Sequence, residues 1–272
     1  MPELPEVEIT KRKLEPLIVG RRVFGLGKIL GIERRGKALM FYLSNNKALA
    51  IHQRMSGRIL VVGRGEKNKY FRRRFKLSNG KDLVLHDVRK FGVVWYGKKD
   101  KILRENYFKT LGPDALAVSL KEFRNLLLPP SSPSQGKDKR ITTPPLVKGR
   151  IGRGIKSFLL NQKNIAGIGN IMADEILWHA HIHPERKIAT LTNSEIKNFW
   201  KSIRSVLNRS IKLGGSSMRD WMHPDNSRGG YFEKRSIYAR EGESCKKCAQ
   251  KILRKKINGR SAYFCENCQK KS

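Results

Sequence analysis

Apolar positions in the first 120 residues follow one helical stretch and then a series of short runs. From Pro5 to Val19 they recur with an approximately helical spacing, and Gly20 is suited to end such a helix. The later runs have the length of strands and are separated by turn sequences such as Ser-Asn-Gly; they span 38–43, 48–51, 59–62, 71–77, 83–85 and 93–96. This half of the chain therefore predicts a β-sandwich or barrel-like domain with a flanking helix.

The pattern changes between Pro129 and Pro145, where Pro, Ser, Gly, Lys and Thr dominate. Such a composition buries too little apolar surface to fold, so it predicts a linker or an exposed insertion. Helical patterns follow at 151–160, 171–180 and 194–213, and Ser194 is the expected cap of the third. We predict an α+β protein with a sandwich domain at 1–128, a linker at 129–147, a largely helical domain at 148–235 and a small cysteine-containing domain at 236–272.

The net charge indicates the kind of partner. Lys and Arg number 58 against 23 Asp and Glu, which gives a formal charge of +35, far more than solubility requires. The basic residues are spread among folded-looking apolar segments, whereas a lipid-binding protein concentrates them on one amphipathic helix or tail. Nucleic acid is therefore the expected partner, and a solvated basic surface without a specific ligand is the alternative.

No run approaches the 18 apolar residues of a membrane helix, and the acidic N-terminus is unlike a secretory signal. We expect a cytoplasmic protein with no membrane partner. All four cysteines lie in the last 28 residues as two C-x-x-C pairs. In a reducing compartment this arrangement favours a metal over disulfides.

The cysteine spacing matches a tetrahedral zinc site. Sixteen residues separate Cys245-x-x-Cys248 from Cys265-x-x-Cys268, and between them an Asn-Gly turn at 258–259 joins two strand-like runs. Four thiolates fill the coordination sphere, so one Zn²⁺ is expected to be structural and to stabilise the hairpin. Arg260 follows the turn, where its guanidinium can meet phosphates; a solvated arginine is the other interpretation.

The N-terminus suggests a reaction. Pro2 follows Met1, and removal of Met1 would expose a secondary amine. An α-amine titrates near 8, so part of it is nucleophilic at neutral pH, and the neighbouring carboxyl groups of Glu3 and Glu6 can move protons. Taken alone, the same residues are also typical of a helix start.

A series of motifs then runs through the whole chain in order. They are PELPEVE at 2–8, MSG at 55–57, DVRKFG at 87–92, LGPDAL at 111–116, GIGNIMADEILW at 167–178, GGYF at 229–232 and the cysteine pairs. This series closely resembles the bacterial formamidopyrimidine-DNA glycosylases. The related endonuclease VIII enzymes typically carry Gly in place of Leu4, so Leu4 favours the purine-repair branch.

The resemblance implies catalytic roles. Pro2 is implied as the nucleophile at the sugar C1′ and Glu3 as the acid that protonates the opening sugar. Lys37 matches a lysine that helps protonate the lesion site and its phosphate. Arg260 becomes a phosphate anchor on the zinc hairpin.

Five further residues match DNA contacts of the family. Met55, Arg89 and Phe91 match residues that fill the gap left by an extruded base, although two of them would otherwise be interpreted as core residues. By the same resemblance, Lys156 and Asn170 match phosphate contacts. The Gly-x-Gly-Asn sequence at 167–170 also leads into a helix, and the backbone amides at its start can bind a phosphate oxygen. This helical region is implied to be a helix-two-turn-helix DNA-binding domain.

The implied activity is base excision repair of oxidised purines, 8-oxoguanine and formamidopyrimidines, in damaged double-stranded DNA by a bifunctional glycosylase and AP lyase. We expect a bacterial, nucleoid-associated monomer with one structural Zn²⁺. Three departures from the family pattern are a short segment before Lys37, Gln53-Arg54 in place of Leu-Gly, and the 129–145 insertion. The alternatives are a nonenzymatic zinc-ribbon nucleic-acid-binding protein and an endonuclease VIII-like enzyme for oxidised pyrimidines.

Overall fold

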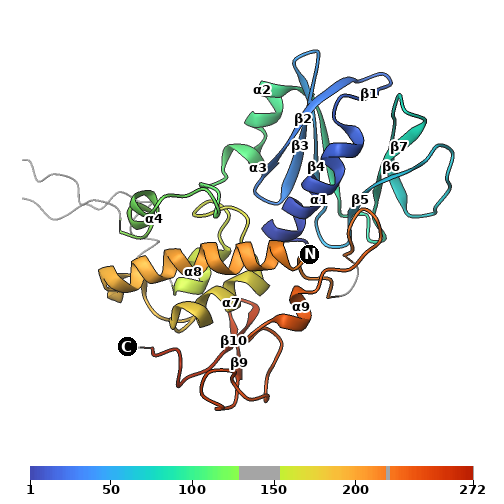
Figure 1. Ribbon diagram of the computed structural model, residues 1–272. Helices are drawn as coiled ribbons and strands as arrows, with labels where there is room; N and C mark the ends of the chain where they lie inside the picture. The colour runs from blue at the N-terminus through green and yellow to red at the C-terminus, as the bar shows by residue number, and fades with distance from the viewer. Residues whose placement is uncertain (129–153, 219–220, 272) are drawn as a thin grey trace, which may run out of the picture. The chain divides into compact units, whose positions relative to one another are not determined.

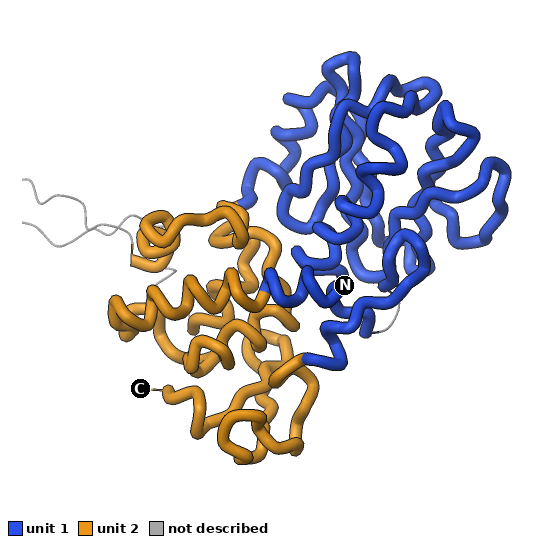
Figure 2. The backbone as a smooth tube through the Cα atoms, in the orientation of Figure 1, with its two compact units in different colours: residues 1–111, 207–234 blue, residues 112–206, 235–272 orange. Residues whose placement is uncertain are grey.

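The computed structural model describes residues 1–128, 154–218 and 221–271 (Figure 1). The chain divides into two compact units (Figure 2). Unit 1 comprises residues 1–111 and 207–234, and unit 2 comprises residues 112–206 and 235–272. Both units are therefore discontinuous in sequence. The linker expected at 129–147 lies outside the described residues, and the domain boundaries drawn from composition stay a prediction.

Unit 1 contains two antiparallel sheets and the first helix, α1 (Leu4–Ile18). The strand order is β1-β2-β3-β4-β8 in the larger sheet and β5-β7-β6 in the smaller. The larger sheet consists of β1 (Arg22–Val23), β2 (Gly27–Arg35), β3 (Ala38–Leu43), β4 (Lys47–His52) and β8 (Val93–Lys98). The smaller sheet consists of β5 (Arg58–Gly63), β6 (Phe71–Lys76) and β7 (Lys81–His86).

The core of unit 1 joins these layers. One cluster of buried side chains takes Leu14 from α1, Phe41 from β3, and Ile59 and Leu85 from the smaller sheet. The opposite face of β3 packs with α2 (Lys99–Arg104) and α3 (Asn106–Lys109). Both faces of β3 are thus covered, and this explains why its sequence is continuously apolar instead of alternating. The predicted sandwich with flanking helices is confirmed.

Each of the six predicted strands is present, and the helix predicted at 5–19 is α1. The sequence pattern did not predict β1 and β2 or the short helices α2, α3 and α4 (Leu120–Leu127). The segment that precedes Lys37, short as it is, still provides the two residues of β1 and the nine of β2, which pair with each other.

Unit 2 is mainly helical. In addition to α4, the described residues form α6 (Ile155–Leu160), α7 (Asn170–Ala180), a 3₁₀ turn at Ile188–Thr190 and the first part of α8 (Asn193–Lys212). Phe123 of α4 packs edge-on against Phe158 of α6 and Phe199 of α8. A hairpin of β9 (Leu253–Ile257) and β10 (Arg260–Phe264) completes the unit.

The third predicted helix begins differently from the expectation. Ser194 lies inside α8, so the prediction that it caps this helix is wrong. Thr192 does so instead: its hydroxyl accepts the backbone N–H of Glu195, and the Glu195 carboxylate accepts the backbone N–H of Thr192 at 2.8 Å. The reciprocal bonds satisfy two donors at the helix start.

Two further expectations concern the helices. The pattern at 151–160 corresponds to α6, while residues 151–153 lie outside the described part of the chain. Among the residues that the structure describes, none of the helices is both long enough and apolar enough to cross a membrane.

Candidate active site and metal centre

The start of α1 places the predicted nucleophile and acid. Pro2 and Glu3 are buried, and Glu3 is the residue that precedes the first turn of α1. Pro5 lies in that first turn, where the missing N–H of proline costs no hydrogen bond. The helix thus fixes the backbone of Glu3 directly beside Pro2.

Glu6 connects this turn to a distant segment of unit 1. One of its carboxylate oxygens accepts the backbone N–H of Glu3 and the other accepts that of Ser216, both at 2.7 Å. Burial and the charge of Glu3 raise the pKa of Glu6 from 4.5 to about 7, against the opposing effect of the backbone N–H bonds. The sequence places Glu6 near Pro2, but nothing in it indicates that the Glu6 side chain joins the start of α1 to Ser216.

Lys37 lies in the turn between β2 and β3 and is 5% exposed. Its backbone N–H donates to the hydroxyl of Tyr107 at 3.0 Å. His52, at the end of the adjacent strand, is also buried; burial and the charges of Arg54 and Lys37 lower the pKa of this imidazole to about 3. A neutral imidazole therefore lies near the lysine at neutral pH, and sequence analysis did not select it.

Met55, Arg89 and Phe91, which we call the wedge residues, lie on two turns of unit 1. The first turn follows β4 and the second follows β7. All three are exposed, and the two apolar ones remain 45% exposed at Met55 and 56% at Phe91. They are not core residues, so this alternative interpretation is wrong for Met55 and Phe91.

The segment from Gly214 to Tyr231 is attached to the rest of unit 1 at several points. Besides the Glu6–Ser216 bond, Lys13 of α1 forms an ion pair with Asp225 at 2.5 Å, and Arg58 of β5 donates to the side chain of Asn226. Hydrogen bonds from Lys13 and Ser227 hold the pKa of Asp225 well below its usual range. Residues 219–220 lie outside the described part of this segment.

Lys156 and Asn170 meet in unit 2 at the zinc hairpin. The Lys156 ammonium is fully buried, forms an ion pair with Asp174 at 2.6 Å and donates to the backbone carbonyl of Ser261 at 2.6 Å. The Asn170 amide donates to the same carbonyl at 3.0 Å, and Asp174 accepts the backbone N–H of Tyr263. Both predicted phosphate ligands therefore contact the hairpin, and their role toward phosphate stays a prediction.

The four cysteines form a compact cluster. Their sulfur atoms all lie within 4.8 Å of one another, with 3.8 Å between Cys245 and Cys268 and 3.4 Å between Cys248 and Cys265. Thiolates around a tetrahedral Zn²⁺ are separated by about 3.8 Å, given Zn–S bonds of about 2.3 Å, so the donor set fits this metal. The indole N–H of Trp178 donates to the Cys245 sulfur at 3.4 Å, which adds a bond from α7 to a ligand.

The hairpin turn matches its prediction. Asn258 and Gly259 both have positive φ angles, 47° and 76°, as a type I′ turn requires. Arg260 follows as the first residue of β10 and is exposed. Its side chain is therefore accessible to a phosphate. Arg260 belongs to unit 2, whereas the other predicted catalytic residues, Pro2, Glu3 and Lys37, belong to unit 1.

Known protein families match successive parts of this chain. Three family models match: the formamidopyrimidine-DNA glycosylase N-terminal domain at residues 25–94, the formamidopyrimidine-DNA glycosylase H2TH domain at 143–221, and the zinc finger found in FPG and IleRS at 242–271. Pro2 and Glu3 precede the first of these matches.

Whole-length relatives extend the similarity to the N-terminus. The chain is 35% identical to a formamidopyrimidine-DNA glycosylase of Pelotomaculum thermopropionicum, with 99% of each chain covered, and 33% identical to that of Rickettsia massiliae, with 99% and 97% covered. Among solved structures, the MutM (Fpg) protein of Thermus thermophilus matches with a TM-score of 0.81 at 30% identity over the full length of both chains. Lactococcus lactis Fpg in complex with DNA containing an abasic site matches with 0.82 at 31% identity, covering 99% of this chain and 100% of that one.

The sandwich, the H2TH helices and the four-cysteine hairpin define the class, a DNA-repair glycosylase with a structural zinc finger. The chain belongs to the formamidopyrimidine-DNA glycosylase family.

Proposed function

We propose that this chain is a bifunctional glycosylase and AP lyase that excises oxidised purines, 8-oxoguanine and formamidopyrimidines, from double-stranded DNA. Family membership supports the glycosylase activity, and one solved relative is MutM in complex with DNA containing carbocyclic 8-oxoguanine. Leu4 supports the purine-repair branch. The endonuclease VIII-like alternative differs in preferring oxidised pyrimidines.

The observation that carries the lyase proposal is the start of α1. Once Met1 is removed, the Pro2 amine attacks the sugar C1′ and the damaged base leaves. Glu3, whose backbone is fixed at the helix start, protonates the opening sugar. As the bond from C1′ to the ring oxygen breaks and Glu3 protonates that oxygen, the proline nitrogen forms an iminium, which stays cationic because a secondary amine has no second proton to lose. From this Schiff base, β-elimination breaks the bond to the 3′ phosphate and δ-elimination the bond to the 5′ phosphate.

The other predicted residues act on phosphates and on the stacked bases. We assign Lys37 to the lesion site and its phosphate, and Arg260, Lys156 and Asn170 to further phosphates. The wedge residues occupy the gap left by the extruded base. We further propose that the protein acts as a monomer. A charge of +35 supports strong sequence-independent binding to duplex DNA.

Borohydride trapping tests the proposal. Purified protein is incubated with a duplex that contains 8-oxoguanine opposite cytosine, reduced, and analysed by mass spectrometry to locate the cross-link. An adduct on Pro2 is the expected result, and a Pro2→Gly variant or a form that retains Met1 should bind the duplex but lose most activity.

Two outcomes contradict the proposal. Tight binding without an adduct or base release favours the nonenzymatic alternative, and full activity in the form that retains Met1 excludes Pro2 as nucleophile. A second assay on a duplex that contains an oxidised pyrimidine tests the endonuclease VIII-like alternative, since an enzyme of that kind would act on this duplex in preference to the one with 8-oxoguanine.

A further inference from the structure

The wedge residues lie on turns that are well separated in sequence. Met55 belongs to the turn between β4 and β5, while Arg89 and Phe91 belong to the turn between β7 and β8. Side chains that enter a base stack together must keep a fixed distance from one another. Contacts that join the two turns therefore bear directly on how firmly the wedge residues are held.

Asp87 provides this connection. It is fully buried, and one carboxylate oxygen accepts the Ser56 hydroxyl at 2.6 Å and the Arg89 backbone N–H at 3.2 Å. The other oxygen accepts the backbone N–H of Gly92 at 2.7 Å. The Asp87 side chain thus closes the turn that contains Arg89. It also links this turn to Ser56, the residue that follows Met55 on the other turn. Three hydrogen bonds from two turns converge on this one buried side chain, so the junction is stiff.

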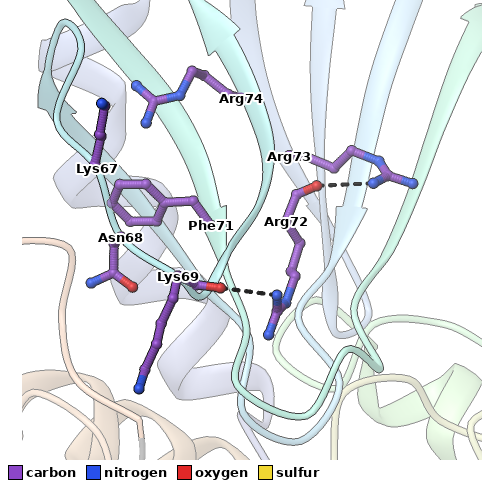
Figure 3. Close-up of a pocket in the computed structure, with 7 residues that line it drawn as sticks. All are labelled: Lys67, Asn68, Lys69, Phe71, Arg72, Arg73 and Arg74. Carbon is purple, nitrogen blue, oxygen red and sulfur yellow. Dashed lines mark hydrogen bonds between the residues drawn. The ribbon is translucent and has the colours of Figure 1, made fainter.

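Arg72 holds the same turn from strand β6. Its guanidinium donates to the backbone carbonyls of Asp87 at 2.8 Å and Lys69 at 3.0 Å, and Figure 3 shows the bond to Lys69. The planar guanidinium holds its donors in a fixed fork, so it fixes the relative positions of the two carbonyls; a lysine ammonium on its flexible stem does not reproduce this geometry. Arg73, the next residue, extends in a different direction in Figure 3 and bonds to the backbone carbonyl of Arg72 at 2.9 Å.

We propose that Ser56, Asp87 and Arg72 are positioning residues that hold the two wedge turns as one rigid body. The inference rests on the proposed glycosylase function, because the wedge acts only when a base leaves the stack. Misplacement by about 1 Å can slow a reaction roughly 100-fold. Loosening the turns should therefore slow the excision of a stacked base much more than the cleavage of a strand that already lacks the base.

The experiment compares Arg72→Gln with Arg73→Gln in the full-length protein. Both variants remove one positive charge from β6, but only the first removes the bonds to the wedge turn. Single-turnover rates are measured on a duplex with 8-oxoguanine opposite cytosine and on the same duplex with a preformed abasic site. We expect Arg72→Gln to lower the excision rate roughly tenfold and the abasic-site rate by less than about threefold, while Arg73→Gln leaves the ratio unchanged.

Two additional variants separate geometry from charge and from folding. Arg72→Lys keeps the charge and loses the fork, so it should behave like Arg72→Gln. If Arg72→Gln does not fold, as judged by thermal unfolding, Ser56→Ala is the test, since it deletes only one hydroxyl and should shift the ratio in the same direction.

Base extrusion gives a readout without turnover. A 2-aminopurine next to the lesion should become brighter on binding of the wild type and less so with Arg72→Gln. The positioning role would be overturned if Arg72→Gln gave the same rate ratio and the same fluorescence change as Arg73→Gln. It would also be overturned if Ser56→Ala gave the values of the wild type. Failure of the proposed function would appear differently, as a wild type that cleaves neither duplex.

Discussion

Replacing Glu6 with Gln is predicted to change the pH dependence of stability. The folded protein raises the pKa of Glu6 from 4.5 to about 7, mainly because the carboxyl group is buried beside Glu3. A pKa that is raised on folding means that the protonated group stabilises the fold. This contribution is fully present below pH 4.5 and is lost as the pH rises to about 7.

The expected magnitude follows from the pKa change. One pKa unit corresponds to about 1.4 kcal/mol, so the free energy of unfolding of the wild type should fall by about 2 to 3 kcal/mol relative to Glu6→Gln between pH 5 and pH 8. Gln has no titrating proton. Its amide also places an NH₂ group against one of the two backbone donors of Glu3 and Ser216, so the variant should excise 8-oxoguanine more slowly.

Urea unfolding at both pH values measures the effect, and Glu8→Gln is the matched control on the same helix. Burial alone would raise the pKa of Glu8, but hydrogen bonds from Arg12 and Arg34 and the charge of Arg34 lower it, so its contribution is present above pH 4.5 and is lost on acidification. The wild-type advantage over Glu8→Gln should therefore not decrease from pH 5 to pH 8. If the difference between wild type and Glu6→Gln is constant within about 0.5 kcal/mol over this range, the assignment of Glu6 is wrong.

Three other predictions address unit 2 and the charge of the chain. Asp174→Asn removes the charged partner of the buried Lys156 ammonium and should lower the free energy of unfolding by about 3 to 5 kcal/mol. The double variant with Lys156→Met and Asp174→Leu leaves no charge unpaired and should recover much of this loss. Thermal unfolding measures both, and equal losses in the two variants would contradict the buried pair. Zinc removal by a chelator should change the fluorescence of Trp178 and weaken duplex binding, both reversibly on addition of Zn²⁺, and an unaltered signal would exclude a structural metal beside this indole. Affinity for undamaged duplex should fall roughly 1000-fold or more between 50 and 200 mM salt, measured by fluorescence anisotropy, and a flat dependence would argue against phosphate binding.

The parts of the fold that depend on local sequence were predictable. The zinc hairpin is the clearest case, because cysteine spacing and the Asn-Gly turn specify it within 28 residues. Apolar runs likewise located the strands of unit 1 except β1 and β2. Strand β2 begins with Gly-Lys and ends with Glu-Arg-Arg, so its apolar positions are too sparse to mark it.

Contacts between distant segments were not predictable. Glu6 is paired with Ser216 and Asp87 with Ser56, and neither pairing has a signature in the sequence. The family resemblance assigned Lys156 to phosphate, and nothing in the sequence indicated that its ammonium is buried in an ion pair with Asp174. The family resemblance selected the candidate residues, whereas the structure was needed to identify their hydrogen-bond and ion-pair partners.

The discontinuity of unit 1 has a consequence for synthesis of the protein. Residues 1–111 contain the start of α1 and the wedge, but the unit also includes residues 207–234, which the ribosome adds much later. Until then, the Glu6 carboxylate lacks the Ser216 amide and Lys13 lacks Asp225. Unit 1 can therefore reach its final form only after most of unit 2 has been translated, so a nascent chain released early carries the start of α1 without the segment that completes its hydrogen bonds.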